Sequence, residues 1–231
     1  MPNPKKDGDG KGDEQNKNRR AVERKLRWAA IALSAVGVAA LFAHVFGWLR
    51  MPFFLAVFGV PSVLLLCALA AYARRIDAEL FLNSLWVGML GGLIATVIYD
   101  GTRALVERSH IFGYNWYVPI LMFGNWITGA PQSSAVAKWA GWTYHYWNGI
   151  SFGVMYALAF GRIRWWWGIG FGIFLEACML GLFPMFLRVT NKFDFVAISM
   201  IGHIAYGAAL GVVVERYALP SERVVPWAKK D

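Results

Sequence analysis

Apolar residues run through this chain in six stretches of helix length, separated by short polar segments. Each stretch holds about 20 residues with almost no charge, which is the length an α-helix needs to cross a bilayer. Inside a bilayer the backbone polar groups must be hydrogen-bonded within the segment, so helices are expected rather than open strands. The pattern therefore predicts an all-α membrane protein with six transmembrane helices. The predicted spans are residues 28–48, 52–73, 80–98, 139–160, 165–187 and 195–214.

A further apolar segment, residues 111–129, is interrupted by Pro119, by three glycines and by internal Asn and Thr residues. If it crossed the membrane, the later loops would be inverted, and more Lys and Arg would then lie outside than inside. That charge distribution is opposite to the positive-inside rule. We therefore predict a re-entrant or interfacial segment on the outer side, with a seventh span as the alternative.

The polar segments around the spans predict an orientation. With the N-terminus in the cytoplasm, 17 of the 23 Lys and Arg residues lie in cytoplasmic segments, as the positive-inside rule requires. Residues 1–27 are predicted to be a disordered basic tail, of which residues 19–27 can extend the first helix. Residues 28–214 form the transmembrane domain, and residues 215–231 form a second basic tail. The expected location is the plasma (inner) membrane, with both termini cytoplasmic.

Composition supports this class and narrows the partners. The chain is 58% hydrophobic and has a net charge of +9. In a soluble protein that charge would favour nucleic acid, but here the cations flank the spans and no basic-aromatic recognition module is present. The expected partner is the lipid bilayer, and no nucleic-acid partner is expected. Cys67 and Cys178 fall inside predicted spans and form no CxxC motif.

Two pairs of predicted helices share a ladder of small residues at every fourth position. Residues four apart lie on one helix face, and small residues there let helix backbones approach closely in lipid. In each pair, the ladder of one helix leads to an acid and the ladder of the other begins at a histidine. We therefore predict a close-packed four-helix core made of two similar helix pairs. The ladders are Gly88–Gly92–Thr96–Asp100 with His145–Gly149–Gly153, and Gly168–Gly172–Glu176 with His203–Gly207–Gly211.

The ionisable residues on these ladders are the candidate site. A charge exposed to hydrocarbon costs roughly 2.5 kcal/mol or more, so these side chains should face the bundle interior. His145 and His203 are predicted to contact a ligand or a proton, together with Asn148 and Tyr206, which lie three residues further along the same faces. Glu176 has no cation near it in the sequence and is expected to pair with one of the two histidines.

Two further assignments concern a gate and a metal. Asp100 and Arg103, at the outer end of the third span, are spaced to pair with each other and are predicted to form the gate. His145, His203 and Glu176 together form a candidate transition-metal site. No helix supplies two strong ligands one turn apart, so the same residues also fit a role in hydrogen bonding alone. The sequence identifies no cofactor.

Two segments carry glycine-led motifs, H-xx-NG-xx-FG-xx-YA in residues 144–162 and H-xx-YG-xx-LG in residues 199–213. With these motifs the chain resembles a group of uncharacterised bacterial multi-pass membrane proteins. The resemblance covers about 140 residues and leaves out the first two spans. It implies a plasma-membrane protein and carries no known activity.

Three functions fit these features. The leading one is binding of a small solute, proton or ion in an outward-opening polar pocket. The second is an intramembrane enzyme acting on a lipid or isoprenoid-like substrate, with the carboxylates as general acid and base. The third is an accessory subunit of a larger membrane complex, with a partner subunit or further copies of the chain. The sequence alone does not decide whether the protein is an enzyme.

Overall fold

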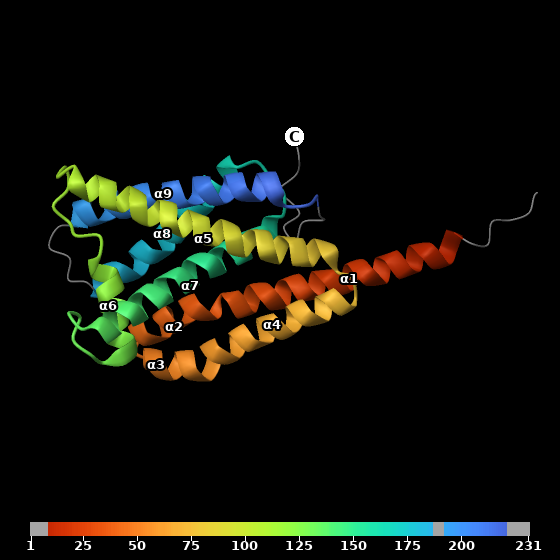
Figure 1. Cartoon of the computed structure of the whole chain (residues 1–231), viewed down its shortest axis with the longest axis horizontal. Coiled ribbons are helices and arrows are strands. Elements are labelled where there is room, and N and C mark those ends of the chain that lie inside the picture. The colour runs from red at the N-terminus through yellow and green to blue at the C-terminus, as the bar shows by residue number, and fades with distance from the viewer. Residues whose placement is uncertain (1–8, 187–191, 221–231) are drawn as a thin grey trace, which may run out of the picture.

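The computed structural model describes residues 9–186 and 192–220 of the chain. Within these residues it consists of helices joined by short loops, so the all-α prediction is confirmed. The long helices run side by side along the long axis of the molecule (Figure 1). The helices are α1 (Asp9–Ser34), α2 (Val36–Val45), α3 (Met51–Phe54), a π-helical turn (Leu55–Gly59), α4 (Val60–Arg75), α5 (Glu79–Arg108), α6 (Val118–Thr128), α7 (Ala135–Phe160), α8 (Trp166–Phe186) and α9 (Lys192–Tyr217).

Several helices have the properties of membrane spans. In the described part of the chain, four helical segments are both long enough and apolar enough to cross a bilayer. Helix α7 has 26 residues, but its middle carries the polar and aromatic run YHYWN (residues 144–148). The apolar part of α8 in the described residues, Trp166–Gly181, is shorter. The four segments are Asn18–Val45, Met51–Arg75, Glu79–Arg108 and Phe193–Tyr217.

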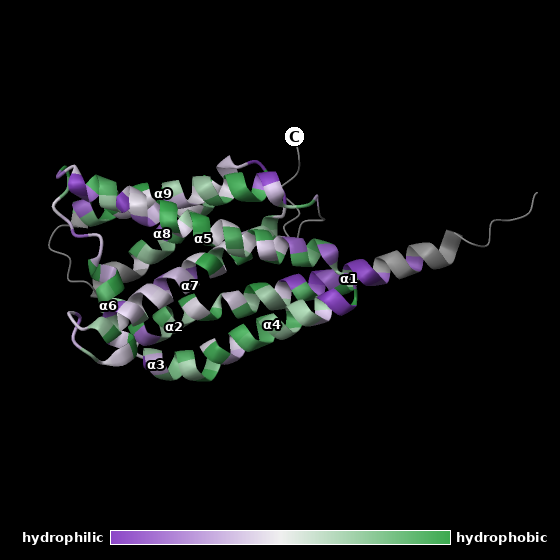
Figure 2. Cartoon of the chain, in the orientation of Figure 1, coloured by the Kyte–Doolittle hydropathy of each residue, from purple (hydrophilic) through white to green (hydrophobic). Residues whose placement is uncertain are grey.

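The outer surface and the two ends of the molecule differ in polarity. Hydrophobic residues cover most of the long helices, while hydrophilic residues gather towards their ends and on α1 (Figure 2). On α4, Val60 and Leu64 are 59% and 64% exposed. Contiguous exposed apolar surface of this kind is unusual in a soluble monomer and is expected for helices that face lipid.

Helix α1 begins at Asp9, inside the segment 1–27 for which composition predicts disorder. Two arginines fasten this extension to the bundle. Arg19 donates a hydrogen bond to the carbonyl oxygen of Asp77, and Arg27 donates one to the carbonyl oxygen of Leu158. The extension is also rich in Lys, Arg, Glu and Gln, which have high helix propensity. The last part of the predicted C-terminal tail, residues 221–231, lies outside the described residues.

Helix α6 occupies the segment 111–129, for which a re-entrant or interfacial conformation was predicted. It has 11 residues, a rise of about 16 Å, which is too short for a hydrocarbon core of about 30 Å. It packs against α7, where Gly124 lies close to the backbone of Ala137. The helix stops before Gly129, whose φ of 69° is the left-handed conformation in which many helices terminate. We call the end of the molecule at which α6 lies the α6 end, and the opposite end the α1 end (Figure 1).

The glycine ladders lie where helices meet. Helix α5 packs against α7 and α9, and α8 packs against α9. A Cβ atom on Gly92 of α5 would lie 2.8 Å from the Cα atom of Ile150 on α7. A Cβ atom on Gly168 of α8 would lie 2.8 Å from the Cα atom of Gly211 on α9. These backbones are therefore too close for any residue larger than glycine, and the two helix pairs use their ladders in the same way.

Candidate functional site

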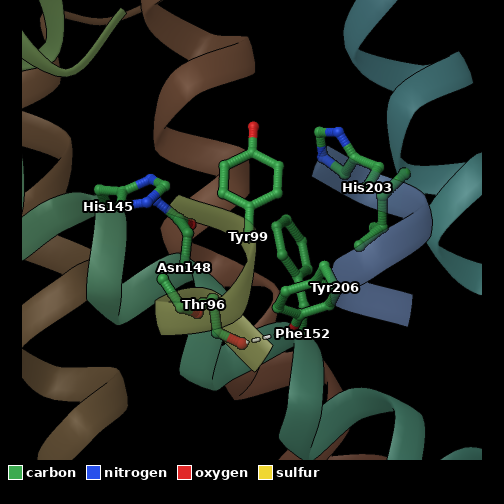
Figure 3. Close-up of a pocket in the computed structure, with 9 residues that line it drawn as sticks. Thr96, Tyr99, His145, Asn148, Phe152, His203 and Tyr206 are labelled. Carbon is green, nitrogen blue, oxygen red and sulfur yellow. Dashed lines mark hydrogen bonds between the residues drawn. The ribbon is translucent and has the colours of Figure 1, made fainter. Parts of the chain in front are cut away.

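A cavity of about 70 Å³ lies where α5, α7, α8 and α9 meet. His145 is the eleventh residue of α7 and His203 the twelfth of α9, so both lie about 15 Å from the α6 end of the molecule. Residues that line the cavity are shown in Figure 3. They are Thr96, Tyr99, His145, Asn148, Gly149, Phe152, Leu175, His203 and Tyr206.

The first acid–histidine pair joins α5 to α7. The Nε2 atom of His145 lies 2.9 Å from Oδ1 of Asp100. Asp100 is 8% exposed. The contact follows from the ladders, because Gly149 lies directly against Thr96. Asp100 follows Thr96 by four residues and His145 precedes Gly149 by four residues on a helix that runs the opposite way, so the two side chains meet on the α6 side of this contact.

The second pair joins α8 to α9 in the same manner. The Nδ1 atom of His203 lies 2.8 Å from Oε2 of Glu176, which is fully buried. The Ser199 hydroxyl donates to the same carboxylate oxygen over 2.7 Å. The carbonyl oxygen of Ser199 also lies 3.0 Å from Nδ1 of His203. Because both neighbours of Nδ1 are acceptors, this nitrogen carries the hydrogen, and Nε2 is the ring nitrogen left for another partner.

Tyr99 stands between the two pairs. Its ring lies between the imidazoles in Figure 3, with ring-centroid distances of 5.8 Å to His145 and 4.9 Å to His203. Its hydroxyl accepts a hydrogen bond of 2.9 Å from Arg103. The two acid–histidine pairs therefore meet across one aromatic ring and share one cavity.

Asp100 and Arg103, which were predicted to form a gate, point to different helices. Asp100 faces α7 and holds His145, whereas Arg103 faces α9 and lies close to Gly202. The guanidinium donates to the Trp116 carbonyl over 2.9 Å and lies over the rings of Tyr99 and Trp116. Residues three apart point about 60° away from each other around a helix. On α5, which has neighbours on two sides, this difference is enough to send the two side chains to different helices.

The two polar residues predicted beside the histidines also line the cavity. The Tyr206 hydroxyl donates to the carbonyl oxygen of Gly149 over 2.6 Å and ties α9 to α7. The amide nitrogen of Asn148 donates to the carbonyl oxygen of Tyr144 over 3.0 Å, within its own helix. Both side chains therefore donate a hydrogen bond to a backbone carbonyl oxygen.

The predicted metal ligands are not assembled into a metal centre. No group of three or more His, Cys, Asp or Glu side chains suited to a metal occurs in the described part of the chain. Glu176 is held by His203, while His145 is held by Asp100 and lies beyond the Tyr99 ring (Figure 3). Each histidine thus pairs with its own carboxylate. His145, His203 and Glu176 therefore do not come together around one point.

Two residues of the site were missed in the sequence. Ser199 precedes His203 by four residues, and the shared helix face indicates that the two meet the same acid. Tyr99 precedes Arg103 by four residues, a spacing at which side chains interact on a helix. The sequence contains both spacings, but it contains many other pairs four residues apart. Which of them belong to the site depends on which helix faces are buried.

Aromatic side chains cover the α6 side of the first pair. The Trp142 ring lies 5.8 Å from that of His145, and its Nε1 atom donates to the Tyr117 hydroxyl over 3.1 Å. Trp116 packs against Trp142 with a centroid distance of 6.0 Å. The segment that precedes α6 thus lies over the same part of α7 that bears the histidine.

Comparisons of the chain with protein-family models, with curated proteins and with solved structures find no match. The short motifs of residues 144–162 and 199–213 correspond in the structure to the two histidine-bearing ladders of α7 and α9. Function therefore has to be inferred from the geometry of the cavity and from its charges.

Proposed function

We propose that the chain is a multi-pass membrane protein in which six helical segments cross the bilayer, with the α1 end in the cytoplasm. Four segments have the length and hydropathy of spans, and α7 and α8 run beside them (Figure 1). The polar middle of α7 is compatible with this because Tyr144 and Gly149 are buried. The charged residues Arg74 and Arg75 lie at the α1 end of α4, as the positive-inside rule requires.

Within this bundle, the cavity binds one proton or one small cation, reached from the α6 end. The observation that carries this proposal is the charge around the cavity. Asp100 and Glu176 are buried carboxylates, and Arg103 is a buried cation that is 3% exposed. With both carboxyl groups ionised and both imidazoles neutral, the site has one excess negative charge. Buried charges are costly unless they are balanced, so one additional positive charge is favoured.

The dimensions of the site favour a proton or small cation over a lipid substrate. The cavity has a volume of about 70 Å³, whereas pockets for drug-sized ligands have about 300–1,000 Å³. The hydroxyl of Ser199 donates to Glu176 and therefore is not activated by His203 as a nucleophile would be. Both observations disfavour an intramembrane enzyme that acts on a lipid or isoprenoid-like molecule.

The packing towards the α1 end favours binding over passage through the protein. Below the cavity, Val87, Tyr156 and Leu210 belong to one buried apolar cluster. The paired ladders continue on this side, where a Cβ atom on Gly88 would lie 2.7 Å from the Cα atom of Val154. A proton or solute that enters from the α6 end is therefore expected to leave by the same route.

Cysteine labelling tests the orientation. In a background with Cys67→Ala and Cys178→Ala, a single cysteine is placed at Gln132, in the loop between α6 and α7, or at Glu79, at the start of α5. Both positions are exposed. A membrane-impermeant maleimide added to intact cells should label Q132C and should label E79C only after lysis. The reverse pattern would invert the protein in the membrane and contradict the proposed outward access.

Nuclear magnetic resonance of the histidine rings tests the binding. With ¹⁵N-histidine in lipid nanodiscs, the signals of the ring nitrogens of His145 or His203 should change reversibly as protons are added, because imidazole can bind a second proton. Asp100→Asn should alter the titration of His145 and leave that of His203 nearly unchanged. If neither ring titrates while the helical content stays constant, the pairs only hold the bundle together.

A further inference from the structure

We infer that the cavity takes a small cation that donates hydrogen bonds, of the size and chemistry of ammonium. This inference rests on the proposed function and names the class of ligand. It follows from the hydrogen-bonding groups that line the cavity, from its size and from its charge.

Two hydroxyl groups of the lining, those of Thr96 and Tyr206, have no hydrogen left to give. Thr96 donates its single hydroxyl hydrogen to the carbonyl oxygen of Gly92 over 2.7 Å. Tyr206 donates its own to the carbonyl oxygen of Gly149 over 2.6 Å. A hydroxyl whose hydrogen is used retains acceptor lone pairs only. Both oxygens therefore present acceptors to whatever occupies the cavity.

The two imidazoles present acceptors for a related reason. Nδ1 of His203 is the donor, since it lies against Glu176 Oε2 and the carbonyl oxygen of Ser199. Nε2 of His145 is the donor towards Asp100. In a neutral imidazole the second nitrogen is an acceptor. Each ring that lines the cavity thus retains one lone pair, and its carboxylate fixes which nitrogen carries it.

The charge and the size of the cavity further restrict the class of ligand that it can hold. A lining that offers acceptors and an excess negative charge disfavours an anion. A cavity of about 70 Å³ admits an occupant of water size, since a single water needs about 10–15 Å³ by the same measure. The rings of Tyr99, Phe152 and Tyr206 contribute to the same lining, and aromatic faces attract cations. A compact cation with N–H donors satisfies all of these conditions.

Potassium provides the sharpest comparison, because it has about the radius of ammonium and no hydrogen to donate. As a hard cation it prefers oxygen ligands, whereas imidazole nitrogen suits transition metals. The acceptor-lined cavity should therefore distinguish the two ions although their charge and size are alike. Tetramethylammonium, which is large and has no N–H group, should be excluded.

The experiment titrates ammonium chloride into ¹⁵N-histidine protein in nanodiscs, with potassium chloride replaced so that ionic strength is constant. The expected result is a saturable shift of the free ring nitrogens of His145 and His203 with ammonium and no saturable shift with potassium. Equal shifts with both ions would overturn the inference, because the site would then select charge alone.

Two threonine variants provide the matched test. Thr96→Val removes one acceptor of the cavity and keeps its shape, and it should weaken ammonium binding about tenfold, as expected for one hydrogen bond to a charged group. Thr143→Val, on an exposed position of α7, should leave binding unchanged. Equal binding by the two variants would contradict the inferred role of the lining hydroxyl.

The outcomes also separate this inference from the proposed function. If ammonium gives no saturable shift but the histidines still titrate with pH, the ammonium inference fails and proton binding stands. If the histidines neither titrate nor respond to ammonium in protein whose helical content is normal, both proposals fail.

Discussion

The α5–α7 pair and the α8–α9 pair are built on the same ladder of small residues but differ in how firmly they hold their acid. Glu176 is fully buried and accepts from both His203 and Ser199. Asp100 is 8% exposed and has His145 as its close partner. The side chain of His145 is 15% exposed, compared with 11% for that of His203.

This difference shows that a repeated pattern can place two acid–histidine pairs in different surroundings. The ladder brings an acid and a histidine together in both pairs, but the surroundings decide how easily the pair can change. The acid of the α8–α9 pair is the more deeply buried of the two. The α5–α7 pair lies beside the aromatic cover of Trp116 and Trp142, and we expect its response to an occupant to be the larger of the two.

The largest expected effect on stability comes from removing the buried acid. Glu176→Ala removes the acceptor of the Ser199 hydroxyl and the carboxylate partner of His203, and loss of one partner of a buried pair costs about 3–5 kcal/mol. Asp100→Ala should cost clearly less, because water reaches that pair more easily. Unfolding of both variants in the same detergent measures the contrast. A larger loss for Asp100→Ala would reverse the proposed roles of the two pairs.

The next effect concerns the ladder itself. Gly172→Ala places a methyl group against the carbonyl oxygen of His203 and should destabilise the protein by about 1–3 kcal/mol through overpacking. Gly170→Ala, two residues away on α8, meets nothing within 4 Å and should be neutral or stabilising by up to about 1 kcal/mol. Unfolding midpoints of the two variants provide the comparison, and equal midpoints would show that the helices can separate without loss.

The same contrast is expected in the other pair. A Cβ atom on Gly92 of α5 would lie 2.6 Å from the carbonyl oxygen of Gly149, whereas one on Gly101 would meet nothing within 4 Å. Gly92→Ala should therefore lower the unfolding midpoint and Gly101→Ala should not. If only one helix pair responds to its alanine variant, the two ladders are not equivalent in energy.

The smallest expected effect concerns the link between the two pairs. Tyr206→Phe removes the hydrogen bond from α9 to the Gly149 carbonyl and should cost about 0.5–1.5 kcal/mol. Tyr72→Phe, at a position that is 50% exposed on α4, is the matched control and should have little effect on unfolding. A loss that is no greater for Tyr206→Phe than for the control would show that this bond does not couple the pairs.

The ladders were readable in the sequence because a spacing of four residues places small side chains on one helix face. The contacts of Gly92 and Gly168 follow directly from that regularity. The contacts of the Arg103 side chain could not be predicted from residue spacing. Its side chain turns to Tyr99 and Trp116 because α5 packs between α7 and α9, and the rotation of a helix between two neighbours is a property of the assembled bundle.

The contacts at the start of α1 were also not visible in the sequence. Residues 1–27 are polar and by composition resemble a disordered tail, although residues 19–27 can extend the first helix. Their helix is held by bonds from Arg19 and Arg27 to carbonyl oxygens of distant segments. A local composition signal cannot report such bonds, because their acceptors lie 58 and 131 residues away along the chain.

The most direct test of the account is the position of the hydrogen on each imidazole, measured by ¹⁵N nuclear magnetic resonance at a pH where the rings are neutral. The account predicts that His203 carries its hydrogen on Nδ1 and His145 on Nε2, so that each ring offers its other nitrogen to the cavity. Hydrogens on the opposite nitrogens would contradict it, because each carboxylate would then lose its histidine donor and the two imidazoles would no longer present acceptors to the cavity.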